Sequence, residues 1–204
     1  ENLLHILAGM DATLDANGLF ANARHHWLFV DWAPGLYAYT PEARLGTQLQ
    51  YLRAYAAAAK LLTELGDAAN AAKYKALTTK ATAATRSAFR DPNTGTYGKT
   101  WQLNALAALT DPGSYSAIWN QILSHVKQNT PTDQTISPYF NAYVLDAMSA
   151  TNHPRQALDW LRQYWGGMLA EGATSFWESY DLRWPRTNPH LSLQADGTSG
   201  YFVS

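Results

Sequence analysis

The chain has 204 residues, of which 47% are hydrophobic and 15% charged, and this is enough for one core of substantial size. Fifteen Lys and Arg stand against 16 Asp and Glu, which leaves no basic surplus for nucleic acid or an acidic membrane surface. The absence of cysteine excludes disulfides, thiolate zinc sites and cysteine nucleophiles. No run approaches the roughly 20 apolar residues of a membrane span. We therefore expect a single domain over residues 1–204.

The start of the chain carries no basic, apolar and small-residue pattern of a signal peptide, because Glu1 leads directly into "NLLHILAGM". This start is typical of the middle of a longer protein. Aromatic residues make up 13% of the chain, with 8 Trp and 12 Tyr. Rings that carry a polar group suit sugar-binding surfaces, although they also fill ordinary cores.

Apolar residues at helical spacing predict seven helices joined by short connections. In chain order they cover about residues 2–18, 41–65, 68–89, 99–109, 114–129, 137–150 and 154–169. Between the first two lies "HHWLFVDWAPG", which predicts an aromatic loop or a short extended segment. Alanine-rich faces at 55–59 and 68–76 allow neighbouring helices to approach closely. Since no fixed repeat aligns, we expect a ring of helical hairpins rather than a solenoid.

One segment does not fit the helical pattern. The stretch "GATSFWESYD", Gly172 to Asp181, places the carboxylate of Glu178 between Trp177 and Tyr180. From the sequence alone, Glu178 is either a solvated loop residue that pairs with an arginine or a functional carboxylate that lies among aromatic rings. Neighbouring rings exclude water, and a partly desolvated carboxylate is a stronger proton acceptor.

Several runs together resemble the bacterial α-L-rhamnosidases of glycoside hydrolase family 78, over nearly the whole chain. They are "WLFVDWAPG", "GTQLQYLRAYAAAAKLLTELGDAANAAKYKAL", "SPYFNAYVLDAMSA", "ALDWLRQYWGGMLAEGATSFWESYD" and "GTSGYFVS". The most specific is "GATSFWE", residues 172–178. The resemblance implies an all-α fold, an (α/α)6 six-hairpin barrel present here as an incomplete C-terminal portion. The N-terminal part of the same barrel would be its missing partner.

The resemblance also implies an inverting hydrolase that releases terminal L-rhamnose from glycosides or polysaccharides. Inversion needs a base that takes a proton from water and an acid that protonates the leaving oxygen, with the two carboxyl groups roughly 6.5 to 9.5 Å apart. Glu178 resembles the base. The acid belongs to an Asp-Glu-Arg stretch that would lie upstream of this chain, so we expect the isolated piece to be inactive. The substrate class favours an extracellular or periplasmic location.

Asp31, Trp32 and Trp177 are candidate sugar-binding residues, because a sugar-stacking tryptophan of the family occurs in a segment similar to "FVDWAP". The alternative for Asp31 and Trp32 is a turn-capping carboxylate beside a core ring. His25 and His26 have no further ligand at metal spacing, so we expect no metal and no cofactor. Gly166 and Gly167 are candidates for a turn of the backbone into the site.

Two other functions stay open. One is a catalytically silent carbohydrate-binding barrel, in which Glu178 would turn to solvent, because a fold does not fix a function. The other is an (α/α)6 glycosidase that acts on glucosides, fucosides or uronides.

Overall fold

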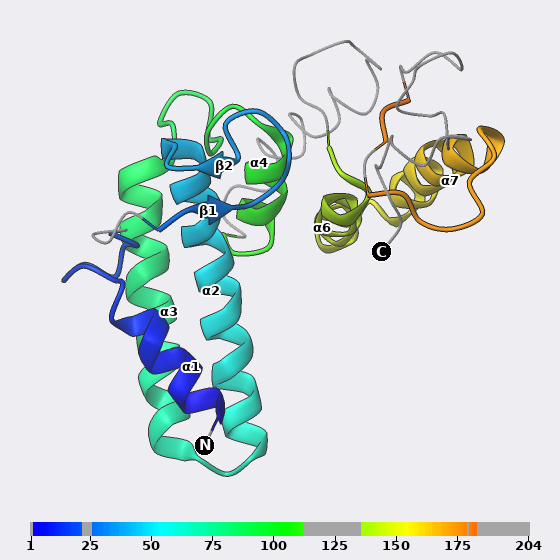
Figure 1. Ribbon diagram of the computed structural model, residues 1–204. Helices are drawn as coiled ribbons and strands as arrows, with labels where there is room; N and C mark the ends of the chain where they lie inside the picture. The colour runs from blue at the N-terminus through cyan, green and yellow to red at the C-terminus, as the bar shows by residue number, and fades with distance from the viewer. Residues whose placement is uncertain (1, 22–25, 112–135, 179, 183–204) are drawn as a thin grey trace.

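The computed structural model describes residues 2–21, 26–111, 136–178 and 180–182, and within these ranges it contains six helices and one pair of two-residue strands (Figure 1). In chain order they are α1 (Asn2–Asp11), β1 (Leu28–Phe29), β2 (Tyr37–Ala38), α2 (Pro41–Glu64), α3 (Ala68–Phe89), α4 (Trp101–Ala108), α6 (Pro138–Ala150) and α7 (Pro154–Ala170). Six of the seven helices predicted from the sequence are present, and the one predicted at 114–129 lies outside the described residues. No helix in these ranges has the length and apolar character needed to cross a bilayer.

Helices α2 and α3 form a long antiparallel hairpin, and α1 lies across its lower end (Figure 1). The Thr40 side chain accepts a hydrogen bond from the amide of Ala43, and Pro41 fills the first turn of α2, where a proline lacks no needed donor. Gly66 turns the chain with a positive φ of 76°, and Asp67 then caps α3. The helices predicted at 41–65 and 68–89 from apolar spacing are therefore present, and these caps set where they begin.

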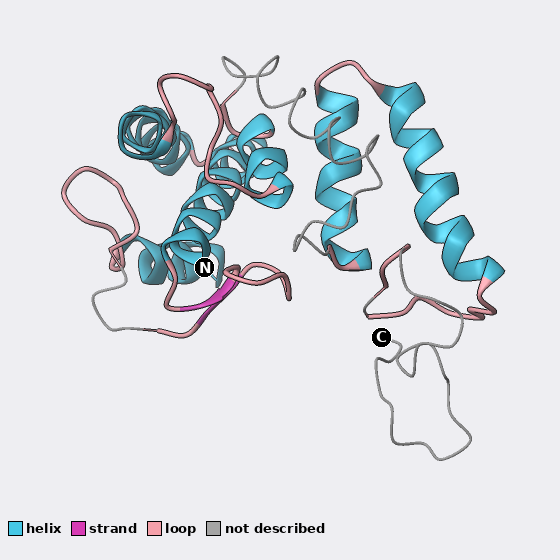
Figure 2. Ribbon diagram, turned by 90° about the horizontal axis from the view of Figure 1, so that it is seen from above, coloured by secondary structure: helices cyan, strands magenta, loops and turns pink. Residues whose placement is uncertain are grey.

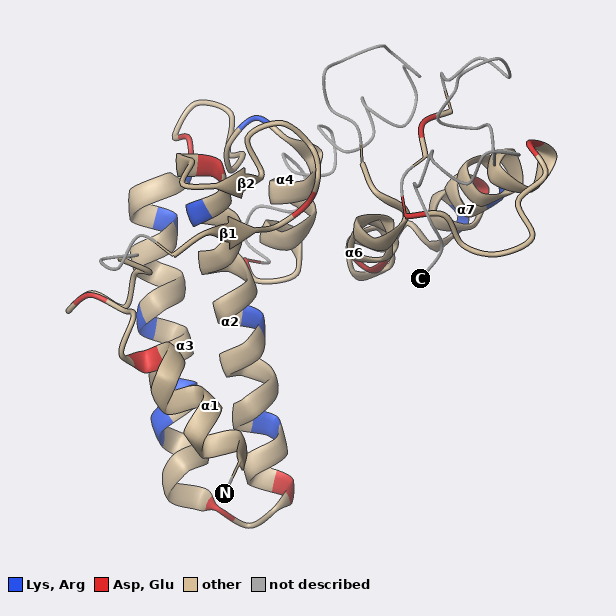
Figure 3. Cartoon of the chain, in the orientation of Figure 1, with Lys and Arg blue, Asp and Glu red and all other residues tan. Residues whose placement is uncertain are grey.

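Helix α4 is the centre of the fold. All eight of its residues are buried, and it packs against both α2 and α6. Figure 3 shows charged residues spread along α2, α3 and α7, whereas α4 has none. A helix that is apolar on every side is surrounded by protein. The polar residues Gln102 and Asn104 within it therefore need internal partners.

Helices α6 and α7 form the second described hairpin. The buried Trp160 of α7 donates its indole N–H to the side-chain oxygen of Asn141 in α6, over 2.7 Å. In Figure 1 this hairpin is seen nearly along its axes while α2 and α3 are seen from the side, and Figure 2 shows the converse view. The two hairpins are therefore steeply inclined to each other, with α4 between them.

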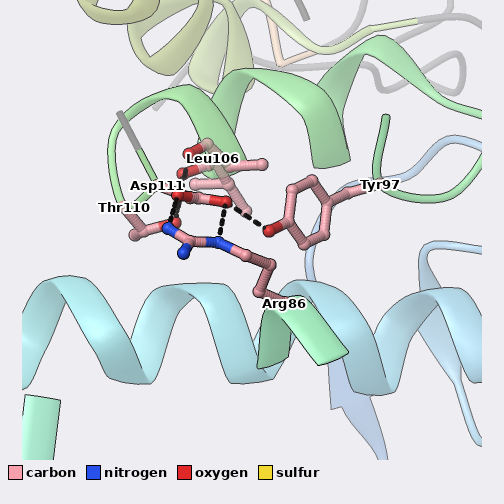
Figure 4. A network of polar contacts seen from close by, with 6 residues as sticks. Arg86, Tyr97, Leu106, Thr110 and Asp111 are labelled. Atoms are coloured by element: carbon pink, nitrogen blue, oxygen red, sulfur yellow. Dashed lines mark hydrogen bonds and ion pairs between the residues drawn. The ribbon is translucent and has the colours of Figure 1, made fainter. Parts of the chain in front are cut away.

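An ion pair with a buried carboxylate links the end of α3 to the residues after α4 (Figure 4). The guanidinium of Arg86 binds both carboxylate oxygens of Asp111, and the Tyr97 hydroxyl donates to the same carboxylate over 2.5 Å. Only 3% of the Asp111 side chain is exposed, against 51% for Arg86. The hydrogen bond to Asp111 and its negative charge raise the pKa of Arg86, whereas burial first, and then the same carboxylate, raise that of Tyr97.

We expect Arg86→Met to lower the free energy of unfolding by about 1–3 kcal/mol, because it leaves a buried carboxylate with one of its donors gone. Exposure of Arg86 keeps the loss below that of a fully buried pair. Arg162→Met is the matched control, since the Arg162–Asp159 pair is exposed on both sides and its loss should cost about 0–1 kcal/mol. Urea unfolding of both variants measures the difference, and equal losses would contradict this account of the pair.

Candidate active site

The loop from Val30 to Leu36 presents Trp32 at the surface. The amide of Val30 donates to the carbonyl of Leu36 over 2.8 Å, and Gly35, with a φ of +84°, closes the turn. From β1 into this loop, Leu28 and Val30 are buried, whereas Phe29 and Trp32 are exposed. Below it lies Gly46 of α2, where a Cβ atom would sit 2.6 Å from a methyl carbon of Val30. Only a glycine there lets α2 support the loop so closely.

Glu178 reaches the same place from the other end of the chain. Helix α7 ends in a Schellman motif: Gly172 has a φ of +94°, and the amides of Gly172 and Ala173 donate to the carbonyls of Leu169 and Met168. The chain then runs away from the helix as far as Glu178. Its Oε1 accepts a hydrogen bond of 3.1 Å from the indole N–H of Trp32, 146 positions earlier. The structure therefore brings the candidate base Glu178 to the candidate sugar-binding residue Trp32.

A row of exposed rings surrounds Trp32, which we call the aromatic row: Trp27, Phe29, Trp32 and Tyr37. Trp27 stacks on Phe29 with centroids 5.8 Å apart, Phe29 meets Trp32 edge to face at 4.8 Å, and Tyr37 lies 6.1 Å from Trp32. Phe29 and Tyr37 are direct partners in the pairing of β1 with β2. The row gives the site a broad apolar surface with the carboxylate of Glu178 at Trp32.

Asp31, next to this surface, is buried with 0% of the residue exposed. Its Oδ2 accepts hydrogen bonds from the side-chain amide of Gln102 in α4 (3.0 Å) and from the backbone N–H of Ser137 (3.3 Å). Its Oδ1 is buried and has no hydrogen-bond partner among the described residues. Burial raises the pKa of Asp31 against the lowering effect of the donors from Ser137 and Gln102.

Trp177 is also buried, with 5% of the residue exposed, and its ring packs edge to face on Tyr180 at 5.7 Å. Contact with a sugar therefore stays a prediction for both Trp177 and Asp31. Their burial favours a role in holding the surrounding backbone in place. Of the three candidates, Trp32 is the one whose ring is open, with 51% exposed.

The pair Gly166 and Gly167 does not turn the backbone, which corrects the sequence interpretation. Both lie inside α7, because helical hydrogen bonds continue to Ala170 and the turn falls at Gly172. Gly167 serves close packing instead: a Cβ there would lie 2.6 Å from the Tyr180 hydroxyl oxygen. The exposed Tyr139, in the first turn of α6, has its hydroxyl 2.8 Å from that of Tyr143.

Sequence reasoning missed Gln102, Ser137 and Tyr164, which hold the site from beneath. A glutamine inside the apolar run "WQLNALAAL" is the one signal that could have been used, because a buried amide needs a partner. Among the residues that the structure describes, no three His, Asp or Glu side chains gather in a way that could hold a metal ion.

Comparison with known proteins identifies the family and the fold of the chain. A profile of the bacterial α-L-rhamnosidase six-hairpin glycosidase domain matches residues 5–195. The chain belongs to this family. The predicted all-α six-hairpin fold and the resemblance stated above are both confirmed by this match.

Among solved structures, the chain is similar to a rhamnosidase from Klebsiella oxytoca with rhamnose bound. The TM-score is 0.69 at 22% sequence identity, which is a likeness of fold. The match covers 84% of this chain and 33% of that one, so this chain spans about a third of its structural relative. A search of curated protein sequences finds no match.

We expect Asp31→Asn to change how stability depends on pH. With a raised pKa, folded Asp31 holds its proton at pH values where the unfolded chain has lost it, so the contribution of Asp31 to the free energy of unfolding falls as pH rises above about 4. The asparagine variant lacks this titration, and its stability relative to wild type should increase with pH until the raised pKa has been passed. Urea unfolding from pH 4 upwards measures this.

Asp146→Asn is the control, since it removes an exposed carboxylate. A stability difference between Asp31→Asn and wild type that stays constant over the whole pH range would contradict the burial cost assigned to Asp31.

Proposed function

We propose that the full-length protein is an inverting α-L-rhamnosidase, and that Glu178 is its general base. The observation that carries this proposal is the 3.1 Å hydrogen bond that fixes the Glu178 carboxylate to Trp32, on an exposed aromatic row, in a chain of the rhamnosidase family. A carboxylate held beside a wide apolar surface is suited to a reaction on a sugar that lies against that surface.

In this proposal, Oε1 of Glu178 is occupied by the indole N–H of Trp32, and we assign Oε2 to the attacking water. Glu178 accepts a proton from that water as its oxygen bonds to the anomeric carbon. The bond between the anomeric carbon and the glycosidic oxygen breaks, and the leaving oxygen takes a proton from a general acid on the opposite side. The family resemblance assigns this acid to the part of the barrel upstream of residues 1–204.

Trp32 is the residue that we assign to the sugar ring. Its half-exposed indole offers an apolar face, while Phe29 and Tyr37 brace it on the aromatic row. Sugar C–H groups pack well on such a face, and water is displaced from around Glu178 as they do so. Asp31, in contrast, is buried, and we assign it to holding the Trp32 loop through its hydrogen bonds with Gln102 and Ser137.

In the full-length protein, Glu178→Gln should lower kcat on an aryl α-L-rhamnoside roughly 10²- to 10⁴-fold, because an amide cannot accept the proton of the water. Rhamnose binding, measured by calorimetry, should persist. Glu64→Gln, at the exposed end of α2 far from the aromatic row, is the control and should keep wild-type turnover. Wild-type turnover in Glu178→Gln would assign the base elsewhere, and a wild type that binds rhamnose without turnover would favour the silent carbohydrate binder.

Two substitutions at Trp32 should separate its ring from its N–H group. Trp32→Ala should raise KM roughly 10-fold, equal to about 1.4 kcal/mol, or about half the free energy of fully burying a large apolar side chain. Trp32→Phe keeps an apolar face but loses the donor to Glu178, so it should lower kcat more than it raises KM. A wild-type kcat in Trp32→Phe would show that the indole N–H does not act on Glu178.

A further inference from the structure

Three segments that are far apart in sequence meet beneath the site, and they are represented by residues 31 and 32, residues 136 and 137, and residues 178 and 180. One side chain of α7 reaches two of them. The Tyr164 hydroxyl lies 2.8 Å from the carbonyl oxygen of Ile136 and 2.7 Å from that of Tyr180. Tyr180 follows Glu178 by two positions, and Ile136 precedes the residue whose amide binds Asp31.

Together with the chain itself, these hydrogen bonds form a closed loop of contacts, which we call the circuit. Trp32 donates to Glu178; the chain leads to Tyr180, whose carbonyl accepts from Tyr164; and the same hydroxyl contacts the carbonyl of Ile136. The next residue, Ser137, donates its amide to Asp31, which is the neighbour of Trp32. The Tyr164 hydroxyl therefore joins the backbone that carries the proposed base to the backbone beneath the ring that holds this base.

The chemistry of this contact requires a hydroxyl. A tyrosine hydroxyl has a single proton, which the two carbonyl oxygens share, and without it two like partial charges would face each other in a buried site. Tyr164 is 2% exposed and packs between the rings of Trp160 (5.6 Å) and Tyr180 (5.3 Å). Burial first, and then the charge of Asp31, raises the pKa of Tyr164 well above its ordinary value, so the donor keeps its proton.

We propose that Tyr164 is a positioning residue of the active site, and that its hydroxyl sets the distance between the Glu178 backbone and Trp32. Its effect on catalysis rests on the proposed function of Glu178. The residue touches neither water nor sugar and acts through Tyr180 on one side and through Ile136, Ser137 and Asp31 on the other. A displacement of about 1 Å in a catalytic group costs on the order of 10²-fold in rate.

The test compares Tyr164→Phe with Tyr74→Phe in the full-length protein. Both variants keep a buried ring and lose one hydroxyl. Tyr74 is a buried residue of α3, and its hydroxyl contacts Asp11 and Lys73 and no residue of the circuit. On an aryl α-L-rhamnoside we expect kcat of Tyr164→Phe to fall at least about 10-fold with a smaller change in KM. Tyr74→Phe should keep wild-type kcat at temperatures where both variants are folded.

A second readout does not depend on activity. Fluorine NMR of fluorotryptophan-labelled protein, with the Trp32 signal assigned by its loss in Trp32→Phe, should show a shifted Trp32 signal in Tyr164→Phe and an unchanged one in Tyr74→Phe. An unchanged kcat, or an unshifted Trp32 signal, in folded Tyr164→Phe would overturn the positioning role. A wild type without rhamnosidase activity would sink the proposed function alone, because the NMR comparison still decides whether Tyr164 sets the position of Trp32.

Discussion

The buried carboxylate of Asp31 is the constraint on which the site depends. It cannot be left without partners in an apolar interior, so the fold brings it two donors, from Gln102 of α4 and from the backbone of Ser137 at the start of α6. Gln102 belongs to α4, between the two hairpins, and Ser137 caps the start of the hairpin formed by α6 and α7. By satisfying one charge, the protein fixes the loop that carries Trp32 against the hairpin that leads to Glu178.

Contacts beneath the loop that carries Trp32 explain how the aromatic row can be exposed and still be held in a defined position. Val30 and Leu36 anchor the two ends of the loop in the core, and Gly46 lets α2 lie directly against it. Trp32 then projects from a short clamped turn rather than from a mobile loop. The Schellman motif at Gly172 does the equivalent for Glu178, because it turns the chain out of α7 in a defined direction.

Much of the fold could be predicted from the sequence, because its signals are local. Thr40 with Pro41, Gly66 with Asp67 and the apolar spacing of α2 and α3 set that hairpin without reference to the rest of the chain. "GATSFWE" likewise pointed to Glu178, and "VDW" to Trp32. What could not be predicted depends on contacts between distant segments. The letters do not show that Asp31 faces Gln102, that Trp177 turns into the core, or that Gly167 makes room for Tyr180 rather than ending a helix.

The central claim is that Glu178 removes a proton from the water that attacks the sugar, with inversion of configuration. Azide rescue of Glu178→Ala in the full-length protein tests it most directly, because azide is a nucleophile that needs no base and fits where the carboxylate was. With an activated aryl α-L-rhamnoside, the account predicts that azide restores turnover and that the product is the β-configured rhamnosyl azide. An α-configured product, or a variant that binds rhamnose and gains no turnover from azide, would contradict it.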